Sequence, residues 1–116
     1  MKAAPVLLVM ALAGCGGNDP PPHAGDAKNG QLLLRQFGCG TCHRIPGVAA
    51  AVGTVGPPLE GITKRVYLAG TVPNTPANLE SWIREPQRHK PGSAMPDMRV
   101  TQAQARDMAA YLQGLR

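Results

Sequence analysis

The chain has 116 residues, enough for one small domain. Glycine (14 residues) and proline (12 residues) are abundant and aromatic residues make up only 3%, so aromatic side chains cannot supply a large core. A domain of this composition benefits from a covalent or metal staple. The formal charge of +5 is a modest basic excess without a run of basic and aromatic residues, which argues against nucleic acid and favours an acidic protein partner.

Residues 1–14 are predicted to be a signal peptide and not part of the fold. Lys2 gives the positive start, and residues 6–12 form an apolar run that is too short to span a bilayer. The run ends in Leu-Ala-Gly before Cys15, which resembles a bacterial lipoprotein signal: the peptide is cut before the cysteine, which is then acylated. An ordinary secretory peptide that happens to contain a cysteine is the alternative. In both cases we expect the mature domain in the bacterial cell envelope, facing the periplasm.

The N-terminal signal is followed by a predicted tether and a single predicted domain. Residues 15–25 are expected to form a lipidated flexible tether, because glycine gives slack and the proline run Pro20–Pro22 gives reach. The domain is expected to span residues 26–116. Its first helix is predicted from Asp26, which can cap the helix by accepting backbone N–H bonds, to about Phe37.

The clearest chemical signal follows this helix, in Cys39-Gly40-Thr41-Cys42-His43. Two cysteines separated by two residues and followed by histidine are the signature of c-type haem attachment. The thiols would add to the two vinyl groups of one haem, and the imidazole would bind the iron. A thioredoxin-like redox pair, a structural zinc site and a disulfide are the alternatives. The first needs a βαβ setting, the second needs further ligands, and the third leaves His43 without a role.

A loop rich in glycine and proline is predicted over residues 45–61. It contains the run Gly-Pro-Pro-Leu that ends at Leu59. A carbonyl of this rigid run could accept a hydrogen bond from the second ring nitrogen of His43 and fix the ring. Ordinary turn chemistry is the alternative. The next segment, residues 60–68, is predicted to be a short helical or irregular turn, whose basic and phenolic groups could bind haem propionates or only form a solvated face.

Two more helices are predicted after a loop at residues 69–76. Thr75 is a plausible cap for the first, with proline next to it at the first helical position, and Pro86 ends it. The second is predicted from Thr101, its cap, to about Leu115, with Met108 in the apolar stripe. The apolar stripe of the earlier helix consists of Leu79, Trp82 and Ile83.

Between these two helices lies a proline-bounded loop, residues 91–98, which contains two methionines. A methionine in a rigid loop is unusual, because methionine normally fills gaps in cores. A thioether is also a known sixth ligand of haem iron. Met95 and Met98 are both candidates, and Met95 is better placed because it lies between Pro91 and Pro96.

Together these motifs resemble the class I c-type cytochromes, over about Gly30 to Leu115. The resemblance rests on the haem motif, the Gly-Pro-x-Leu block, the helix that ends at Pro86 and the methionine loop, in the family's order. Residues 69–76 and the following helix are similar to the cytochrome c domain fused to subunit II of some haem–copper oxidases. We expect the cytochrome portion alone, without the copper-binding domain of those fusions.

The resemblance implies an all-α class I cytochrome c fold, with about three main helices and loops wrapped around one haem c. The haem would be bound covalently through Cys39 and Cys42. His43 and Met95 would be the iron ligands, and the carbonyl of Pro57 would hold the His43 ring. The remaining predicted contacts are haem walls at Leu59, Trp82 and Ile83, and propionate contacts at Ser93, Arg65 and Tyr67.

The predicted function is electron transfer by a lipid-anchored, single-haem cytochrome that passes single electrons between periplasmic or membrane redox partners. Two axial side chains would fill both open positions of the iron, which argues against an enzyme. We expect a monomer that binds an acidic docking face of an oxidase or another respiratory complex. The alternatives are a haem enzyme or ligand sensor with a labile sixth ligand, and a permanently bound electron-input subunit of an oxidase.

Overall fold

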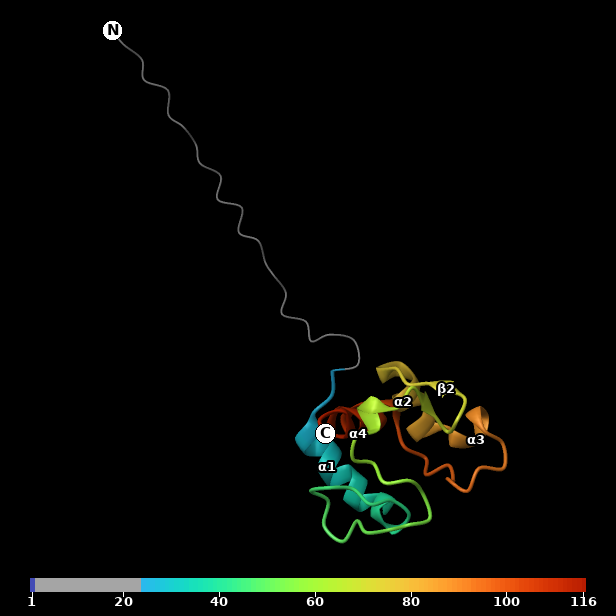
Figure 1. Ribbon diagram of the computed structural model, residues 1–116. Coiled ribbons are helices and arrows are strands. Elements are labelled where there is room, and N and C mark those ends of the chain that lie inside the picture. Colours follow the sequence, from blue (N-terminus) through green and yellow to red (C-terminus); the bar gives the residue numbers. More distant parts are fainter. Residues whose placement is uncertain (2–23) are drawn as a thin grey trace.

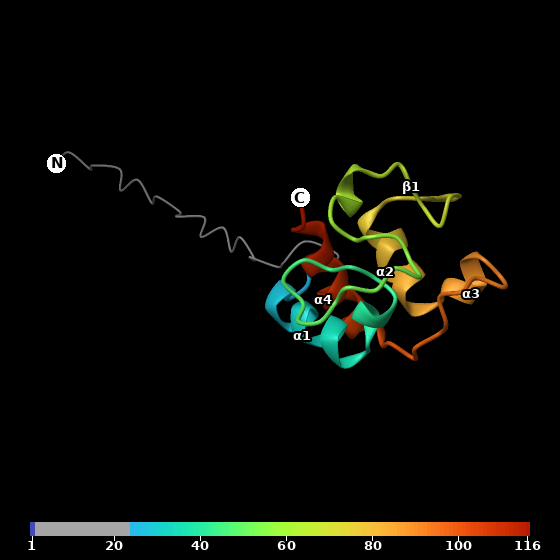
Figure 2. The ribbon, with the colours of Figure 1, turned by 60° about the horizontal axis from the view of Figure 1, so that its bottom comes forward.

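The computed structural model describes residue 1 and residues 24–116. Residues 2–23, which contain nearly all of the predicted signal peptide and tether and the predicted acylation site Cys15, lie outside the described residues. Figures 1 and 2 show a compact group of helices joined by long loops. The helices are α1 (Ala27–Gln36), α2 (Pro76–Arg84), α3 (Pro86–His89) and α4 (Gln102–Gln113). The short elements are the helical turns η1 (Cys39–Thr41) and η2 (Ile62–Lys64) and the strands β1 (Tyr67–Leu68) and β2 (Val72–Pro73).

The predicted helix caps are confirmed. The Asp26 carboxylate accepts hydrogen bonds from the first backbone N–H groups of α1. The Thr75 hydroxyl accepts from the N–H of Asn78 in α2, which has Pro76 at its first position. Thr101 and Gln104 form a reciprocal capping box at the start of α4. These three helices therefore begin where a local side chain satisfies free N–H groups of the first turn.

The fold is centred on a close crossing of α1 and α4, visible in both views (Figures 1 and 2). Gly30 allows the approach, because a Cβ atom there would overlap the main-chain carbonyl of Asp107. The side chain of Asp107 completes the contact by accepting hydrogen bonds from the Asp26 N–H (2.8 Å) and from the Asn29 side-chain amide (2.7 Å). The crossing therefore joins the start of the domain to its last helix.

The core is aliphatic and lies between α1, α2 and α4. Met108 is fully buried in it, which confirms that this methionine belongs to the core. Trp82 and Tyr111 are partly buried and pack against its edge. The buried apolar residues are Leu33, Leu34, Ile45, Val48, Ala51, Leu59, Ile62, Leu68, Leu79, Ile83, Val100, Ala105, Met108, Ala109 and Leu112. The fold is mostly helical with one two-stranded sheet, so the predicted all-α class is confirmed.

A small hairpin and a fourth helix were not predicted. β1 and β2 pair in antiparallel register around Ala69 (φ 49°) and Gly70 (φ 83°), a primed turn that suits the strand twist. Strands of two residues are too short to show alternation in the sequence. Pro86 ends α2 as predicted, but it also begins α3, since proline is favoured at the first position of a helix.

None of the helices in residues 24–116 is long and apolar enough to cross a lipid bilayer. The lipid attachment predicted at Cys15 falls on a residue that the structure does not describe.

Replacing Gly30 by alanine should destabilise the domain. Alanine is the better helix former by about 1 kcal/mol. The added Cβ would nevertheless lie 2.9 Å from the main-chain nitrogen of Met108 and closer still to the Asp107 carbonyl, so the two helices must separate. We expect the free energy of unfolding, measured with denaturant, to fall by about 2 kcal/mol. Gly114→Ala is the control, and an equal loss there would contradict the explanation.

Candidate haem-binding site

The chain changes direction sharply after α1 and enters residues 39–44, the attachment segment. Gly38 adopts φ 71°, a left-handed conformation, and starts the η1 turn at Cys39. The N–H of His43 donates to the carbonyl of Cys39 (3.0 Å), so the turn brings the histidine back beneath the first cysteine. Cys39 and Cys42 are free, half-buried thiols with no disulfide between them. Burial raises the pKa of the Cys39 thiol above its usual value.

The loop that follows lies along the attachment segment and is hydrogen-bonded to it. The N–H of Gly53 donates to the carbonyl of Gly40 (3.0 Å), and the N–H of Gly56 donates to the carbonyl of Cys42 (2.7 Å). Such contact requires small residues on both sides: a Cβ at Gly40 would lie 2.6 Å from the Cα of Ala51. The abundant glycine of this region therefore serves close packing of two main-chain segments.

One ring nitrogen of His43 makes a hydrogen bond, and the other is available to bind a metal. Its Nδ1 lies 2.7 Å from the carbonyl oxygen of Pro57. A carbonyl oxygen only accepts hydrogen bonds, so Nδ1 carries the proton and donates it. The lone pair of the neutral imidazole then resides on Nε2, the atom that can bind a metal. The contact between His43 and Pro57 that the sequence interpretation required is therefore present.

Gly56 determines how the ring of His43 lies. A Cβ atom at Gly56 would lie 2.7 Å from Nδ1 and 2.9 Å from Nε2, so the main chain passes against the edge of the imidazole. Only glycine, which has no Cβ, leaves that space free. No role was predicted for Gly56, although the Gly-Pro pair was the signal that could have identified it.

The loop that supplies the Pro57 carbonyl is held from its other side. The guanidinium of Arg65 donates to the carbonyl of Pro58. The side-chain amide of Asn74 donates to the carbonyls of Ile62 (2.8 Å) and Arg65 (2.9 Å), which fixes the η2 turn that carries the arginine. Arg65 was predicted to contact propionates; in this structure its guanidinium contacts the loop beside the His43 support.

The other predicted site residues are spread over the core and the surface. Leu59 and Ile83 are buried in the core cluster and Trp82 packs against it, with its ring 6.3 Å from that of His89. Tyr67, a candidate for a propionate contact, is 53% exposed. The structure therefore places Leu59 and Ile83 in the interior, Trp82 at the edge of the core and Tyr67 at the surface.

The methionine loop leaves α3 and returns to the start of α4 (Figure 2). Met95 is half-buried, whereas Met98 is 40% exposed. The N–H of Met95 donates to the hydroxyl of Ser93 (3.3 Å). Ser93 is the third residue that was predicted to contact propionates. The side-chain amide of Gln87 donates to the carbonyls of Ser93 (2.7 Å) and Met95 (2.8 Å). Gln87 was not predicted as a site residue, because no periodicity or motif marks it.

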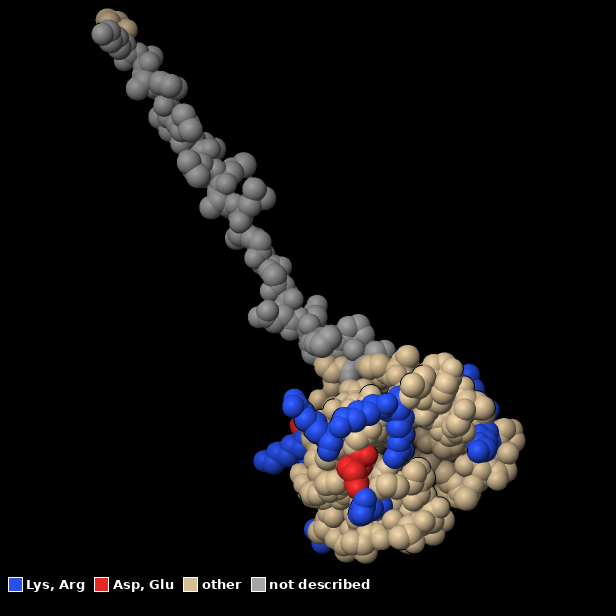
Figure 3. Space-filling model, viewed as in Figure 1, with Lys and Arg blue, Asp and Glu red and all other residues tan. Residues whose placement is uncertain are grey.

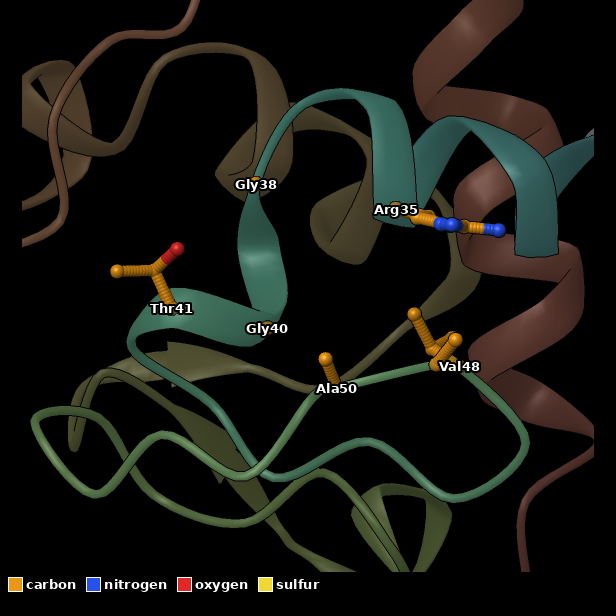
Figure 4. A pocket seen from close by; sticks show the side chains of 7 residues that line it. Arg35, Gly38, Gly40, Thr41, Val48 and Ala50 are labelled. Atoms are coloured by element: carbon orange, nitrogen blue, oxygen red, sulfur yellow. The ribbon is translucent and has the colours of Figure 1, made fainter.

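A small cavity of about 240 Å³ lies against the attachment segment (Figure 4). It is lined by Arg35, Gly38, Gly40, Thr41, Val48, Ala49 and Ala50. Neither the cysteines nor His43 nor Met95 lines it, so it is distinct from the predicted haem site.

The donor set in this structure fits a c-type haem. Two free thiols are separated by two residues, an imidazole keeps Nε2 available, and the half-buried side chain of Met95 offers a thioether. Within residues 24–116, no three His, Cys, Asp or Glu side chains gather to hold a metal ion. The described residues therefore form no zinc site of such ligands.

The family model for cytochrome c matches the chain over residues 27–116. The chain belongs to the cytochrome c family. Two similar curated proteins are each named cytochrome c oxidase subunit 2: the protein of Alkalihalophilus pseudofirmus is 34% identical over 93 residues, and that of Bacillus subtilis is 26% identical over 94 residues. Each match covers 78% of this chain but only 26% of the relative.

These findings confirm the predicted resemblance to class I cytochromes and to the domain fused to oxidase subunit II. Membership of the cytochrome c family implies a covalently bound haem c and haem-based electron transfer. The geometry of this cytochrome agrees with that chemistry, because the ring of His43 is oriented by a carbonyl and its Nε2 is available.

Replacing Gly56 by alanine should displace the His43 ring and break its hydrogen bond to Pro57, because the new Cβ would occupy the position of the ring edge. We expect the amount of haem bound per mole of chain to fall by about ten-fold or more. Losses of this size are usual when the hydrogen-bond partner of a metal ligand is removed. Pyridine haemochrome absorbance per mole of chain measures the loading. The exposed neighbour Val55→Ala is the control, and normal loading and spectra in Gly56→Ala would contradict the assignment.

Proposed function

We propose that this protein is a single-haem electron carrier in which His43 and Met95 bind the iron and Cys39 and Cys42 hold the macrocycle. One observation carries the proposal: the Nδ1–H of His43 donates a hydrogen bond to the Pro57 carbonyl at 2.7 Å, so the lone pair on Nε2 is available to bind iron. Met95 supports it, because it is half-buried in a loop fixed by side chains, while Met98 is more exposed.

The bound haem supplies one-electron chemistry between ferric and ferrous iron. The protein's part is to bind, orient and shield. The Pro57 carbonyl keeps the proton of His43 on Nδ1, and Gly56 fixes the plane of the ring. The Met95 thioether favours the ferrous state relative to a second imidazole and so raises the potential. Leu59 and Ile83 belong to the apolar core and Trp82 packs against it, so in this proposal these three side chains would keep water from one face of the haem.

An electron carrier is the better proposal than an enzyme or a ligand sensor. An enzyme needs an open iron position for its substrate, and the Met95 thioether would fill that position. In the described residues the loop around Met95 is cross-linked by hydrogen bonds from Gln87, as expected for a ligand that stays in place.

We propose an acidic surface on a respiratory complex as the docking partner of a monomeric carrier. Figure 3 shows Lys and Arg side chains over much of one face of the domain, with acidic side chains among them. Opposite charge speeds and orients such an encounter. Exposed basic side chains without an ion pair among residues 24–116 are Lys28, Arg35, Lys64, Lys90, Arg99 and Arg116.

A permanent place in an oxidase complex is the second candidate. The similar curated proteins are named as oxidase subunits, and the chain spans 26% of their length. Val52 and Val55 also expose 75% and 73% of their surface in the loop bonded to the attachment segment, which gives an apolar rim there. The chemistry of the haem would be the same in both cases.

Replacing Met95 by alanine should abolish the thioether-to-iron charge-transfer band of the oxidised protein and lower the reduction potential, because the sixth ligand is lost. Absorption spectroscopy and redox titration measure the two effects. Met98→Ala is the matched control and should retain both properties. If Met95→Ala keeps the band while Met98→Ala loses it, Met98 is the ligand.

Changing Cys15 to alanine should leave the domain folded but move it from the membrane to the soluble periplasm, because the proposed acyl anchor requires that thiol. Fractionation followed by haem staining measures the distribution. Asn18→Ala alters the same segment without removing the thiol and should stay with the membrane. Continued membrane binding of the Cys15 variant would indicate an uncleaved helix or a partner as the anchor.

A further inference from the structure

The loop that carries Met95 has few main-chain restraints of its own. Within the described part of the chain, the main-chain groups of residues 94–100 make no hydrogen bond to another main-chain group. Both polar groups of the Met95 backbone are instead satisfied by side chains, its N–H by Ser93 and its carbonyl by Gln87. The position of this methionine therefore depends on two side chains, and only that of Gln87 comes from outside the loop.

The side-chain amide of Gln87 uses both of its ends. Its Nε2 donates to the carbonyls of Ser93 (2.7 Å) and Met95 (2.8 Å), which uses both N–H groups. Its Oε1 accepts from the N–H of Gly92 (3.0 Å). One half-buried side chain thus holds three main-chain groups across four residues of the loop.

The base of this cross-link is rigid. Pro86, the residue before Gln87, is among the largest fully buried side chains, and it anchors the single turn of α3. The turn is closed by a hydrogen bond from the N–H of Lys90 to the carbonyl of Pro86 (2.9 Å). Gly92 follows with φ 78°, which turns the chain back over the Gln87 amide.

We infer that Gln87 is a positioning residue for the sixth iron ligand: its amide holds the main chain of Met95 so that the thioether stays on the iron. The inference rests on the proposed role of Met95. Without the two donated hydrogen bonds, the loop opens more often, and a small ligand reaches the ferric iron more easily.

Two substitutions separate the two ends of the amide. Gln87→Glu keeps an oxygen that accepts from Gly92, but its carboxylate cannot donate to the two carbonyls and is repelled by them. Gln87→Ala removes both ends. Gln36→Glu makes the same chemical change at an exposed position at the end of α1 and is the matched control.

The first measurement is the rate at which cyanide binds to the ferric, haem-loaded protein. We expect Gln87→Glu and Gln87→Ala to react about ten-fold faster than the parent, the ratio expected from the loss of hydrogen bonds to one side chain. Both variants should also show a weaker thioether-to-iron band and a lower reduction potential. Gln36→Glu should match the parent, as should Gly30→Ala below its unfolding transition, which tests whether lost stability alone opens the site.

The second measurement does not depend on the iron ligand. Hydrogen exchange at the Gly92 amide, followed by NMR, should be about ten-fold faster in Gln87→Ala than in the parent, because its acceptor is gone. It should stay slow in Gln87→Glu. Unchanged exchange in Gln87→Ala would overturn the cross-link itself.

The outcomes separate the inference from the proposed function. If the parent shows thioether ligation but the Gln87 variants match it in cyanide binding, band and potential, Gln87 does not position the ligand. If the parent itself shows no thioether band, the proposed ligation by Met95 is wrong, and the positioning role falls with it. In that case the Gly92 exchange still decides whether Gln87 holds the loop.

Discussion

The hydrogen bond from His43 Nδ1 to the Pro57 carbonyl is the interaction on which the site depends. It selects the tautomer that leaves Nε2 free, and it fixes the direction in which Nε2 points. The bond needs a carbonyl at one place, and the surrounding chain provides it. Gly56 allows the loop to lie against the ring, and Arg65 holds the neighbouring Pro58 carbonyl. The fold serves this contact by bringing three turns of residues 43–65 together.

The two proposed iron ligands are held in different ways. On the histidine side, main-chain hydrogen bonds tie the loop to the attachment segment at Gly53, Gly56 and Leu59. On the methionine side, the described chain offers side-chain contacts in place of main-chain ones, chiefly from Gln87. Main-chain pairing across several residues opens only cooperatively, whereas a contact through one amide opens alone. The sixth position is therefore the more easily altered of the two, both by mutation and by an incoming ligand.

The sequence predicted those features that are local. Asp26, Thr75 and Thr101 start helices because each supplies an oxygen to N–H groups two or three residues ahead. The haem motif is local as well. The roles of Gly56 and Gln87 were not predicted, because they depend on contacts that form only on folding. Gly56 packs against the ring of His43, 13 positions earlier, and Gln87 donates to carbonyls that lie beyond a turn. The resemblance to cytochromes supplied the Pro57 contact, which spacing alone left open beside ordinary turn chemistry.

The site and the core overlap only in part, and this decides which residues can change function alone. Leu59 and Ile83 belong to the apolar core cluster of the described residues, so a change there would remove core packing as well as the proposed wall of the haem site. With aromatic residues at only 3%, the aliphatic core has little surplus, and the covalent haem would act as its staple. Gln87 and Met95 lie outside that cluster. Evolution could therefore adjust the sixth ligand and the potential through this loop without weakening the helices beneath it.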